Sequence, residues 1–219
     1  MPRYSRQDWK VYNNVFDTFT KDTLMKLQAQ GHYDELLSPI TLGKEANVFT
    51  ATKGEQIVVI KIYRWMNCNF NTMFSYLADD ERYINLKNQK RKVVLAWVQR
   101  EFNNLNIARE YIPVPLPHTV RNNVIVMDFI GDDVTAAPML KDKPPKNPKK
   151  FYEECKAHLL KLKEGGLVHG DVSAFNILNH NEKPVFIDFS QATTVRSPRA
   201  QELYERDLKQ LDAWFTRLR

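Results

Sequence analysis

The chain has 219 residues, of which 43% are hydrophobic and 26% charged, and its formal net charge is +6. This length allows one large domain or two small lobes with a sizeable core, and the composition is that of an ordinary soluble globular protein. The two cysteines, Cys68 and Cys155, lack any paired spacing, so neither a disulfide framework nor a zinc site is expected. No apolar run is long enough to span a bilayer, and the opening "MPRYSRQDWK" has no signal-peptide core. We therefore expect a cytoplasmic protein without a membrane partner.

The first half of the chain is predicted to contain a helix, a sheet and a second helix. Residues 8–30 carry apolar side chains at four-residue spacing, which indicates an amphipathic helix. From 38 to 64, short β-branched runs separated by glycines predict strands joined by tight turns. Residues 65–92 show no strand pattern, and helical spacing returns over 95–111 until the prolines of "IPVPLP" end it.

The second half is predicted to be mainly helical. A hairpin is expected around Asn122–Asn123, and a helix from Pro148 to Glu164 that Gly165–Gly166 would end. A turn and strand follow in "NHNEKPVFIDF", and Ser197–Pro198 would cap the last helix. The order of elements predicts an α+β protein with a sheet-rich N-terminal lobe and a helical C-terminal lobe.

The segment "LVHGDVSAFNIL", residues 167–178, places polar side chains in an otherwise apolar run. Asp171 and Asn176 lie five residues apart there, and Asp188 ends the apolar strand "VFIDF". These groups can be satisfied turn residues, or they can be hard oxygen ligands of the kind that suits Mg²⁺ with bound phosphates. An amide would coordinate the ion without adding a further negative charge.

Three earlier pieces support the second reading. The small-residue turn of "TLGKEANVF" would let backbone amides approach phosphates, while Val48 covers a flat base. Lys61 lies within the apolar strand "VVIKIY" and needs an anionic partner, which Glu101 on the helix "WVQREFNNL" can supply. Each piece alone has an ordinary structural explanation. Together, the five pieces follow the order of the protein-kinase signature.

The chain resembles the RIO kinases, a family of atypical protein kinases. "GKEANVF" resembles their phosphate loop, "HGDVSAFN" their catalytic loop and "IDFSQA" their metal-binding strand, and the likeness runs from about residue 30 to 215. The motif "GKEAN" is closer to the RIO-one branch. The resemblance implies a bilobal protein-kinase-like fold and a single RIO domain over 1–219. Its parts would be a helical extension (1–30), an N-lobe (31–130) with a flexible insert near 65–92, and a C-lobe (131–219) without an activation loop or substrate-docking helices.

The resemblance also implies roles for individual residues. Asp171 would be the catalytic aspartate, and Asn176 with Asp188 would hold Mg²⁺ or Mn²⁺. Asp188 would also be a possible phospho-acceptor in an ATPase cycle, and Lys61 would contact the phosphates and pair with Glu101. The adenine would meet the segment of Met127, Asp128 and Ile130, and the nucleotide would be covered by Gly43, Lys44, Glu45, Ala46 and Val48. Gly170 stands where ordinary kinases have an arginine, which argues against control by a phosphorylated activation loop.

The function implied is that of a Mg-ATP-dependent serine/threonine kinase and ATPase in small ribosomal subunit maturation. Its partner would be an rRNA-rich pre-ribosomal particle. A Ser or Thr of the insert at 65–92, such as Thr72 or Ser75, could be an autophosphorylation site, and the sequence does not choose between them. Two alternatives stay open: a small-molecule kinase of the aminoglycoside or choline type, and a nucleotide-gated rRNA-binding module. The module would use the basic stretches 86–92 and 141–150, with Tyr83 and Trp97 stacking on bases. The oligomeric state is not predicted.

Overall fold

The structure, a computed structural model, describes residues 16–65, 68–83, 89–133 and 135–218. They divide into two units, one comprising the residues up to Cys68 with His118–Phe129, the other comprising Asn69–Pro117 with Ile130 onward. In chain order the elements are α2 (Thr18–Ala29), β1 (Glu35–Leu42), β2 (Ala46–Lys53), β3 (Gln56–Tyr63), α3 (Phe70–Ala78), η1 (Glu81–Tyr83), α4 (Lys90–Ala108), β4 (Pro117–Arg121), β5 (Val124–Asp128), β6 (Gly131–Asp132), β7 (Thr135–Ala136), α5 (Pro148–Glu164), β8 (Leu167–Val168), β9 (Ile177–His180), β10 (Lys183–Phe186), β11 (Thr193–Thr194) and α6 (Ala200–Thr216).

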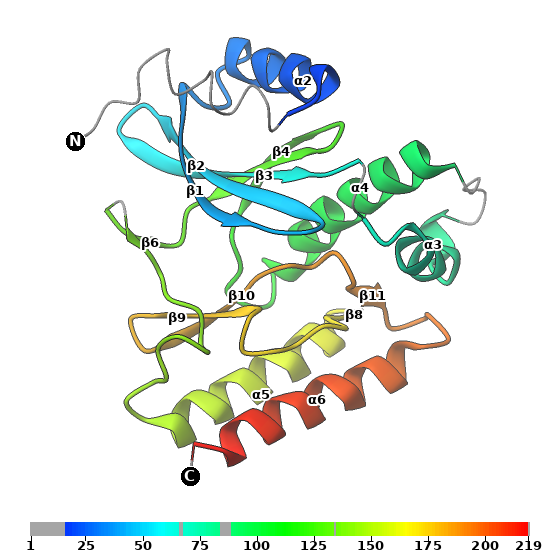
Figure 1. Cartoon of the computed structure of the whole chain (residues 1–219). Coiled ribbons are helices and arrows are strands. Elements are labelled where there is room, and N and C mark those ends of the chain that lie inside the picture. Colours follow the sequence, from blue (N-terminus) through cyan, green and yellow to red (C-terminus); the bar gives the residue numbers. More distant parts are fainter. Residues whose placement is uncertain (1–15, 66–67, 84–88, 134, 219) are drawn as a thin grey trace. The chain divides into compact units, whose positions relative to one another are not determined.

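The first unit is a five-stranded sheet in the order β1-β2-β3-β5-β4, with helix α2 on one face (Figure 1). The predicted hairpin is confirmed, because β4 and β5 are neighbours and Asn122 adopts φ +54°, a conformation that asparagine tolerates in tight turns. The predicted first helix is present as α2, which begins after the N-cap Asp17. The earlier part of that prediction, residues 8–15, lies outside the described residues.

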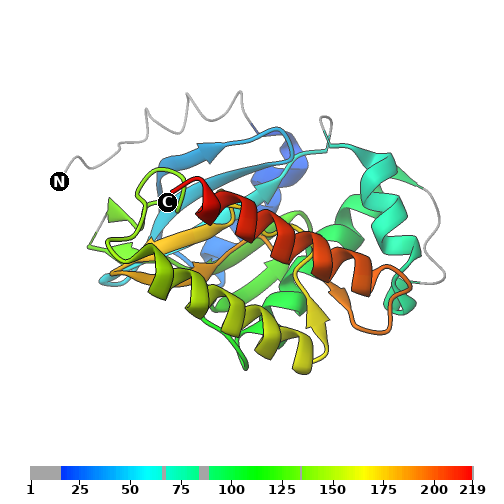
Figure 2. The same cartoon turned by 90° about the horizontal axis from the view of Figure 1, so that it is seen from below.

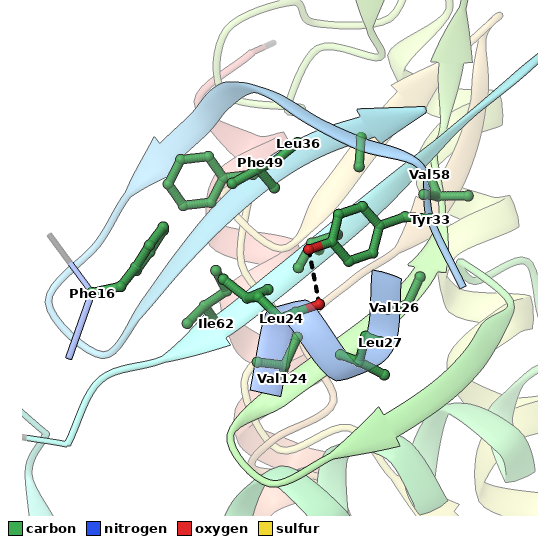
Figure 3. Packing of buried hydrophobic residues seen from close by; sticks show 12 residues of the cluster. Phe16, Leu24, Leu27, Tyr33, Leu36, Phe49, Val58, Ile62, Val124 and Val126 are labelled. Atoms are coloured by element: carbon green, nitrogen blue, oxygen red, sulfur yellow. Dashed lines mark hydrogen bonds between the residues drawn. The ribbon is translucent and has the colours of Figure 1, made fainter. Parts of the chain in front are cut away.

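The two faces of this sheet carry different side chains. Figure 3 shows the face under α2, where Phe49, Ile62 and Val126 pack around Leu24, and the Tyr33 hydroxyl donates to the Leu24 carbonyl at 3.1 Å. Since successive side chains of a strand alternate between faces, the residues between these core positions point to the opposite face. That opposite face carries three of the predicted nucleotide contacts, Val48, Lys61 and Met127.

The second unit is built on two long helices that lie side by side, α5 and α6 (Figures 1 and 2). Helix α5 begins and ends where the sequence predicts, and Gly166 after it adopts φ +90°, which a glycine reaches without strain. The short strands β8 and β11 form one pair and β9 and β10 another. The loop that carries the "HGD…N" motif connects β8 to β9. The predicted α+β architecture, with a sheet-rich part and a helical part, is therefore confirmed.

The segment 65–92, predicted as a flexible insert, has helical structure that the sequence analysis did not predict, while its flexibility stays a prediction. It contains helix α3 and the 3₁₀ turn η1, and helix α4 already begins at Lys90. Residues 66–67 and 84–88 lie outside the described part. Helix α3 forms because Asn69 caps its first turn and because Met73, Tyr76 and Leu77 bury one apolar side.

Helices α3 and α4 group with the second unit, and the predicted lobe bounds of 31–130 and 131–219 stay a prediction. Two further sequence expectations need correction. Trp97 is buried against the Tyr76 ring, with centroids 6.0 Å apart, so it does not present its face to a base. Ser197 does not cap α6: the N-cap is Arg199, since residues 197–200 form a turn closed by the Ala200 amide and the Ser197 carbonyl. Within the described ranges, no helix is long and apolar enough to cross a membrane.

Candidate active site

Asp171 and Asn176 are joined directly within the loop between β8 and β9. The Asn176 Nδ2 atom donates to the backbone carbonyl of Asp171 at 2.9 Å and to its Oδ2 atom at 3.0 Å. The five-residue spacing thus closes a tight loop in which the amide nitrogen is used internally. The Asn176 Oδ1 atom is then the atom of that amide that can meet a cation.

Asp188 is brought to this loop by the residue before it, Ile187. The Ile187 N–H donates to the Asn176 carbonyl at 3.0 Å, and the Ile187 carbonyl accepts from His169 Nε2 at 3.1 Å. Asp188 adopts φ +63°, an uncommon conformation for a residue other than glycine, and accepts a hydrogen bond from Ser190 Oγ at 2.8 Å. The structure therefore brings the predicted catalytic residue and both predicted metal ligands together.

The electrostatics of this cluster favour a proton on Asp171 more than in water. Burial, and then the negative charge of Asp188, raise the pKa of Asp171 to about 6, against the opposing effects of Arg206 and Asn176. Burial lowers the pKa of His169, which keeps the imidazole neutral. In the neutral ring, Nε2 carries the proton and donates a hydrogen bond to the Ile187 carbonyl, while Nδ1 accepts a hydrogen bond from the Asp171 N–H at 3.3 Å.

The donor set fits a magnesium ion better than a transition metal. Asp171 and Asp188 offer carboxylate oxygens, and Asn176 offers an amide oxygen. Mg²⁺ is usually held by one or two carboxylates, with waters and substrate phosphates completing its octahedron. Among the residues that the structure describes, no group of three or more His, Cys, Asp or Glu side chains is arranged to hold a metal ion by itself.

Two residues of helix α6 that were not predicted from the sequence bind the backbone of the loop between β8 and β9. Asp207 accepts from the Gly170 N–H at 2.7 Å and from the Val172 N–H at 3.0 Å, and Arg206 donates to the Gly170 carbonyl. Burial holds the pKa of Asp207 above its usual range, although both N–H groups favour the carboxylate. A signal was present, since Asp207 lies four residues from both Leu203 and Leu211 and so shares the apolar side of the helix.

The structure explains why residue 170 is a glycine. It adopts φ +76°, and a Cβ atom at this position would lie 3.1 Å from the Gln191 carbonyl oxygen. A side chain here would be strained by the backbone conformation and would press on the segment after Asp188. The prediction that this glycine excludes activation-loop control is untested, but the close approach explains why a glycine is suitable.

The first unit presents the other predicted nucleotide contacts. Val48 lies directly opposite Lys61 in the β2–β3 ladder, so their side chains share the sheet face away from α2, and Met127 lies opposite Val59 on that face. The turn before Val48 is tight, because the Gly43 N–H donates to the Ala46 carbonyl at 3.0 Å and a Cβ on Gly43 would lie 2.7 Å from that oxygen. Lys44 and Glu45 are exposed at its tip.

The remaining predicted contacts are located but not tested. Lys61 is 9% exposed in the first unit and Glu101 is 1% exposed on α4 in the second, and their pairing stays a prediction. The units divide between Phe129 and Ile130, inside the predicted adenine-binding segment. The Asp128 carboxylate lies 2.6 Å from His118 Nε2, and the Ile130 carbonyl accepts from the Ala137 N–H at 2.9 Å.

Comparison with known proteins identifies similar sequences over nearly the whole chain. A family model described as the RIO domain matches residues 47–219. The RIO-type serine/threonine-protein kinase Rio1 of Methanocaldococcus jannaschii is 42% identical over 97% of this chain and 74% of its own length. The Rio1 protein of Haloferax volcanii is 40% identical over 95% and 73%. Human RIO1 is 32% identical, and the match covers 97% of this chain but 39% of that protein.

A solved structure has the same fold. The Rio2 kinase from Chaetomium thermophilum, determined as an ADP/Mg²⁺–phosphoaspartate complex, matches with a TM-score of 0.68. The match covers 89% of this chain and 59% of that chain, at 24% identity. At this identity the likeness speaks for the fold alone.

Proposed function

Since the chain belongs to the RIO family of serine/threonine protein kinases and is of the Rio1 type, we propose that it uses Mg-ATP both to phosphorylate a protein and to hydrolyse ATP. We further propose that this activity serves maturation of the small ribosomal subunit. The observation that carries the catalytic part is the cluster in the second unit, where Asp171 binds Asn176 and both are linked through Ile187 to Asp188.

The cluster supports a phosphoryl transfer of known chemistry. The oxygen of an acceptor hydroxyl or water would attack the γ-phosphorus of ATP, the bond to the ADP oxygen would break, and the proton would pass to the Asp171 carboxylate. In the ATPase branch, a carboxylate oxygen of Asp188 would attack instead, and water would then hydrolyse the acyl phosphate. Asn176 and Asp188 would hold the Mg²⁺ ion, which when bound would supply positive charge that offsets the negative charge of the phosphates.

The proposed partner is an RNA-rich particle. A net charge of +6 and the lysine-rich stretch 141–150 are compatible with RNA phosphates, but Trp97 is buried and cannot stack on a base. The similar proteins reported above are named serine/threonine-protein kinases, which favours a protein acceptor over the alternative of a small-molecule kinase. A particle of the immature small subunit, autophosphorylation of the insert and a cytoplasmic location stay predictions.

Turnover of ATP with and without immature small ribosomal subunits tests this proposal. Wild type should hydrolyse ATP, and the particle should change the rate, whereas Asp171→Ala and Asp188→Ala should abolish turnover. Asp171→Ala should still bind nucleotide, because Asp171 acts on the acceptor and not on the adenine or the phosphates. Undiminished turnover in either variant would refute the mechanism, and a rate indifferent to the particle would refute the ribosomal role.

A further inference from the structure

The segment between strand β3 and helix α4 contains a fully buried carboxylate, Asp80. Arg82 binds it through two atom pairs, Nε to Oδ1 at 2.8 Å and Nη2 to Oδ2 at 2.7 Å, and Arg100 Nε lies 3.3 Å from Oδ2. Burial alone would raise the pKa of Asp80, but the hydrogen bonds and charge of Arg82, together with the charge of Arg100, hold it below its usual value. A buried carboxylate is costly unless it is paired in this way.

Hydrogen bonds connect Arg82 to a distant part of the chain. Arg82 Nη2 also donates to Asn104 Oδ1 at 3.0 Å. Asn104 Nδ2 in turn donates to the carbonyls of Phe189 at 2.9 Å and of Ala192 at 2.7 Å. We call the four side chains that make these contacts the Asp80 network: Asp80, Arg82, Arg100 and Asn104.

Arg100 makes the network rigid as well as connected. Its side chain has no exposed surface, and its Nε atom also donates to the Ala192 carbonyl at 3.2 Å. Its guanidinium lies 5.5 Å from the centre of the Trp97 ring and 5.8 Å from that of Tyr76. These rings stabilise the buried charge, whose two terminal nitrogens have no hydrogen-bond partner among the described residues.

The carbonyls that the network binds belong to the loop that follows Asp188. Asp188 itself has a left-handed backbone, φ +63°, and such a conformation persists only where the surroundings fix it. On one side it is fixed through Ile187, whose backbone binds the loop of Asp171. On the other side it is fixed by the Asp80 network, because the Phe189 and Ala192 carbonyls accept from Asn104 and the Ala192 carbonyl accepts from Arg100 as well.

We infer that the Asp80 network positions the Asp188 loop, so that the segment 69–83 is a working part of the active site and not a passive insertion. Arg82 and Asn104 are positioning residues: they touch neither the substrate nor the metal site but set the backbone that carries one of its ligands. The inference rests on the proposed function for the role of Asp188. It adds that changes in segment 69–83 alter metal-dependent catalysis from a distance.

Hydrogen–deuterium exchange of the ligand-free full chain tests whether the network holds the loop. We expect Arg82→Gln and Asn104→Ala to speed exchange in residues 186–195 by about tenfold or more, since local opening there becomes easier. Helix α5 should keep its protection. Asn106→Ala is the matched control, because Asn106 lies on the same helix and its side chain donates to the Phe102 carbonyl of that helix, at 3.0 Å.

The Mg²⁺ dependence of ATP turnover tests whether the loop geometry matters for catalysis. In both variants the half-saturating Mg²⁺ concentration should rise about tenfold, as for other residues that orient metal ligands, with Asn106→Ala unchanged. If Arg82→Gln fails to fold, Arg82→Lys replaces it, since lysine keeps a charge beside Asp80 but cannot also reach Asn104 as a planar fork.

The outcomes are separable. Unchanged exchange in 186–195, or an increase spread evenly over the second unit, would overturn the inference. Faster exchange with an unchanged Mg²⁺ requirement in an active enzyme would also overturn it. Absence of turnover in the wild type would refute the proposed function instead, and the exchange data would still show whether the network holds the loop.

Discussion

The Asp207 carboxylate accepts a hydrogen bond from the Gly170 N–H at 2.7 Å, across 37 residues of sequence. Its other oxygen accepts from the Val172 N–H at 3.0 Å, so one buried side chain of helix α6 holds the backbone on both sides of Asp171. The position of the predicted catalytic carboxylate is therefore fixed by the last helix of the described chain as well as by its own loop.

This arrangement predicts the effect of Asp207→Asn. An amide can accept from one of the two N–H groups but turns its own NH₂ group toward the other, so one buried donor loses its partner. We expect unfolding to become easier by about 1–3 kcal/mol, and turnover of ATP to fall more steeply than nucleotide affinity. Thermal melts and steady-state kinetics measure both. Asp212→Asn, on the exposed side of the same helix, should change neither, and an equal effect in that control would contradict this role.

The raised pKa of Asp171 predicts that this carboxylate lowers the free energy of unfolding at neutral pH, although turnover requires it. Its pKa is raised from 3.8 to about 6, so the folded protein disfavours the charged form that a proton acceptor needs. We expect Asp171→Asn to abolish turnover and yet to raise the free energy of unfolding at neutral pH by about 1 kcal/mol, which is a few degrees in melting temperature for a chain of this size.

The pH dependence of that gain follows from the direction of the shift. Between pH 3.8 and about 6 the folded wild type binds more protons than the unfolded chain, so its stability falls as the pH rises through this window. The stability difference between Asp171→Asn and wild type should be full above about pH 6 and should vanish as the pH approaches 3.8. Melts at a series of pH values measure it, and a difference that grows toward acid pH would contradict the assignment.

The sequence contained enough to locate the active-site loop but not what supports it. Asp171, Asn176 and Asp188 lie within one short stretch, and local bonds through Ile187 join them, so spacing alone indicated their proximity. Helix α5 was also predictable from local residues, because a proline marks its beginning and glycines mark its end. The bond from Asn104 to Ala192 spans 88 residues, and no local pattern indicates such a pair. Helix α3 was missed because its short apolar side resembles an irregular segment.

Gly170 and Gly31 together separate two effects of adding a side chain, the strain of a positive φ and the steric contact of the new Cβ atom. Both adopt positive φ, +76° and +72°, but a Cβ on Gly31 meets nothing within 4 Å, whereas a Cβ on Gly170 lies 3.1 Å from the Gln191 carbonyl oxygen. Gly31→Ala should therefore lose only the roughly 1 kcal/mol of a left-handed alanine. Gly170→Ala should lose more in thermal melts and should also slow turnover. Equal losses in the two variants, with full activity in both, would contradict the close approach.

Lys61 is the residue of the first unit on which a direct test of nucleotide binding depends. It lies opposite Val48 and Ile125 in the sheet, on the face away from the core under α2, and is 9% exposed.

Lys61→Met keeps the length of the side chain in its apolar surroundings and removes the charge. We expect kcat/KM for ATP to fall about 100-fold, as when a charge-stabilising donor is removed. Lys53→Met, at the end of β2, removes the same charge from the same sheet and should leave kcat/KM unchanged. A variant at Lys61 that keeps full kcat/KM would show that the charge of this strand does not act on the phosphates, whatever its partner in the folded chain.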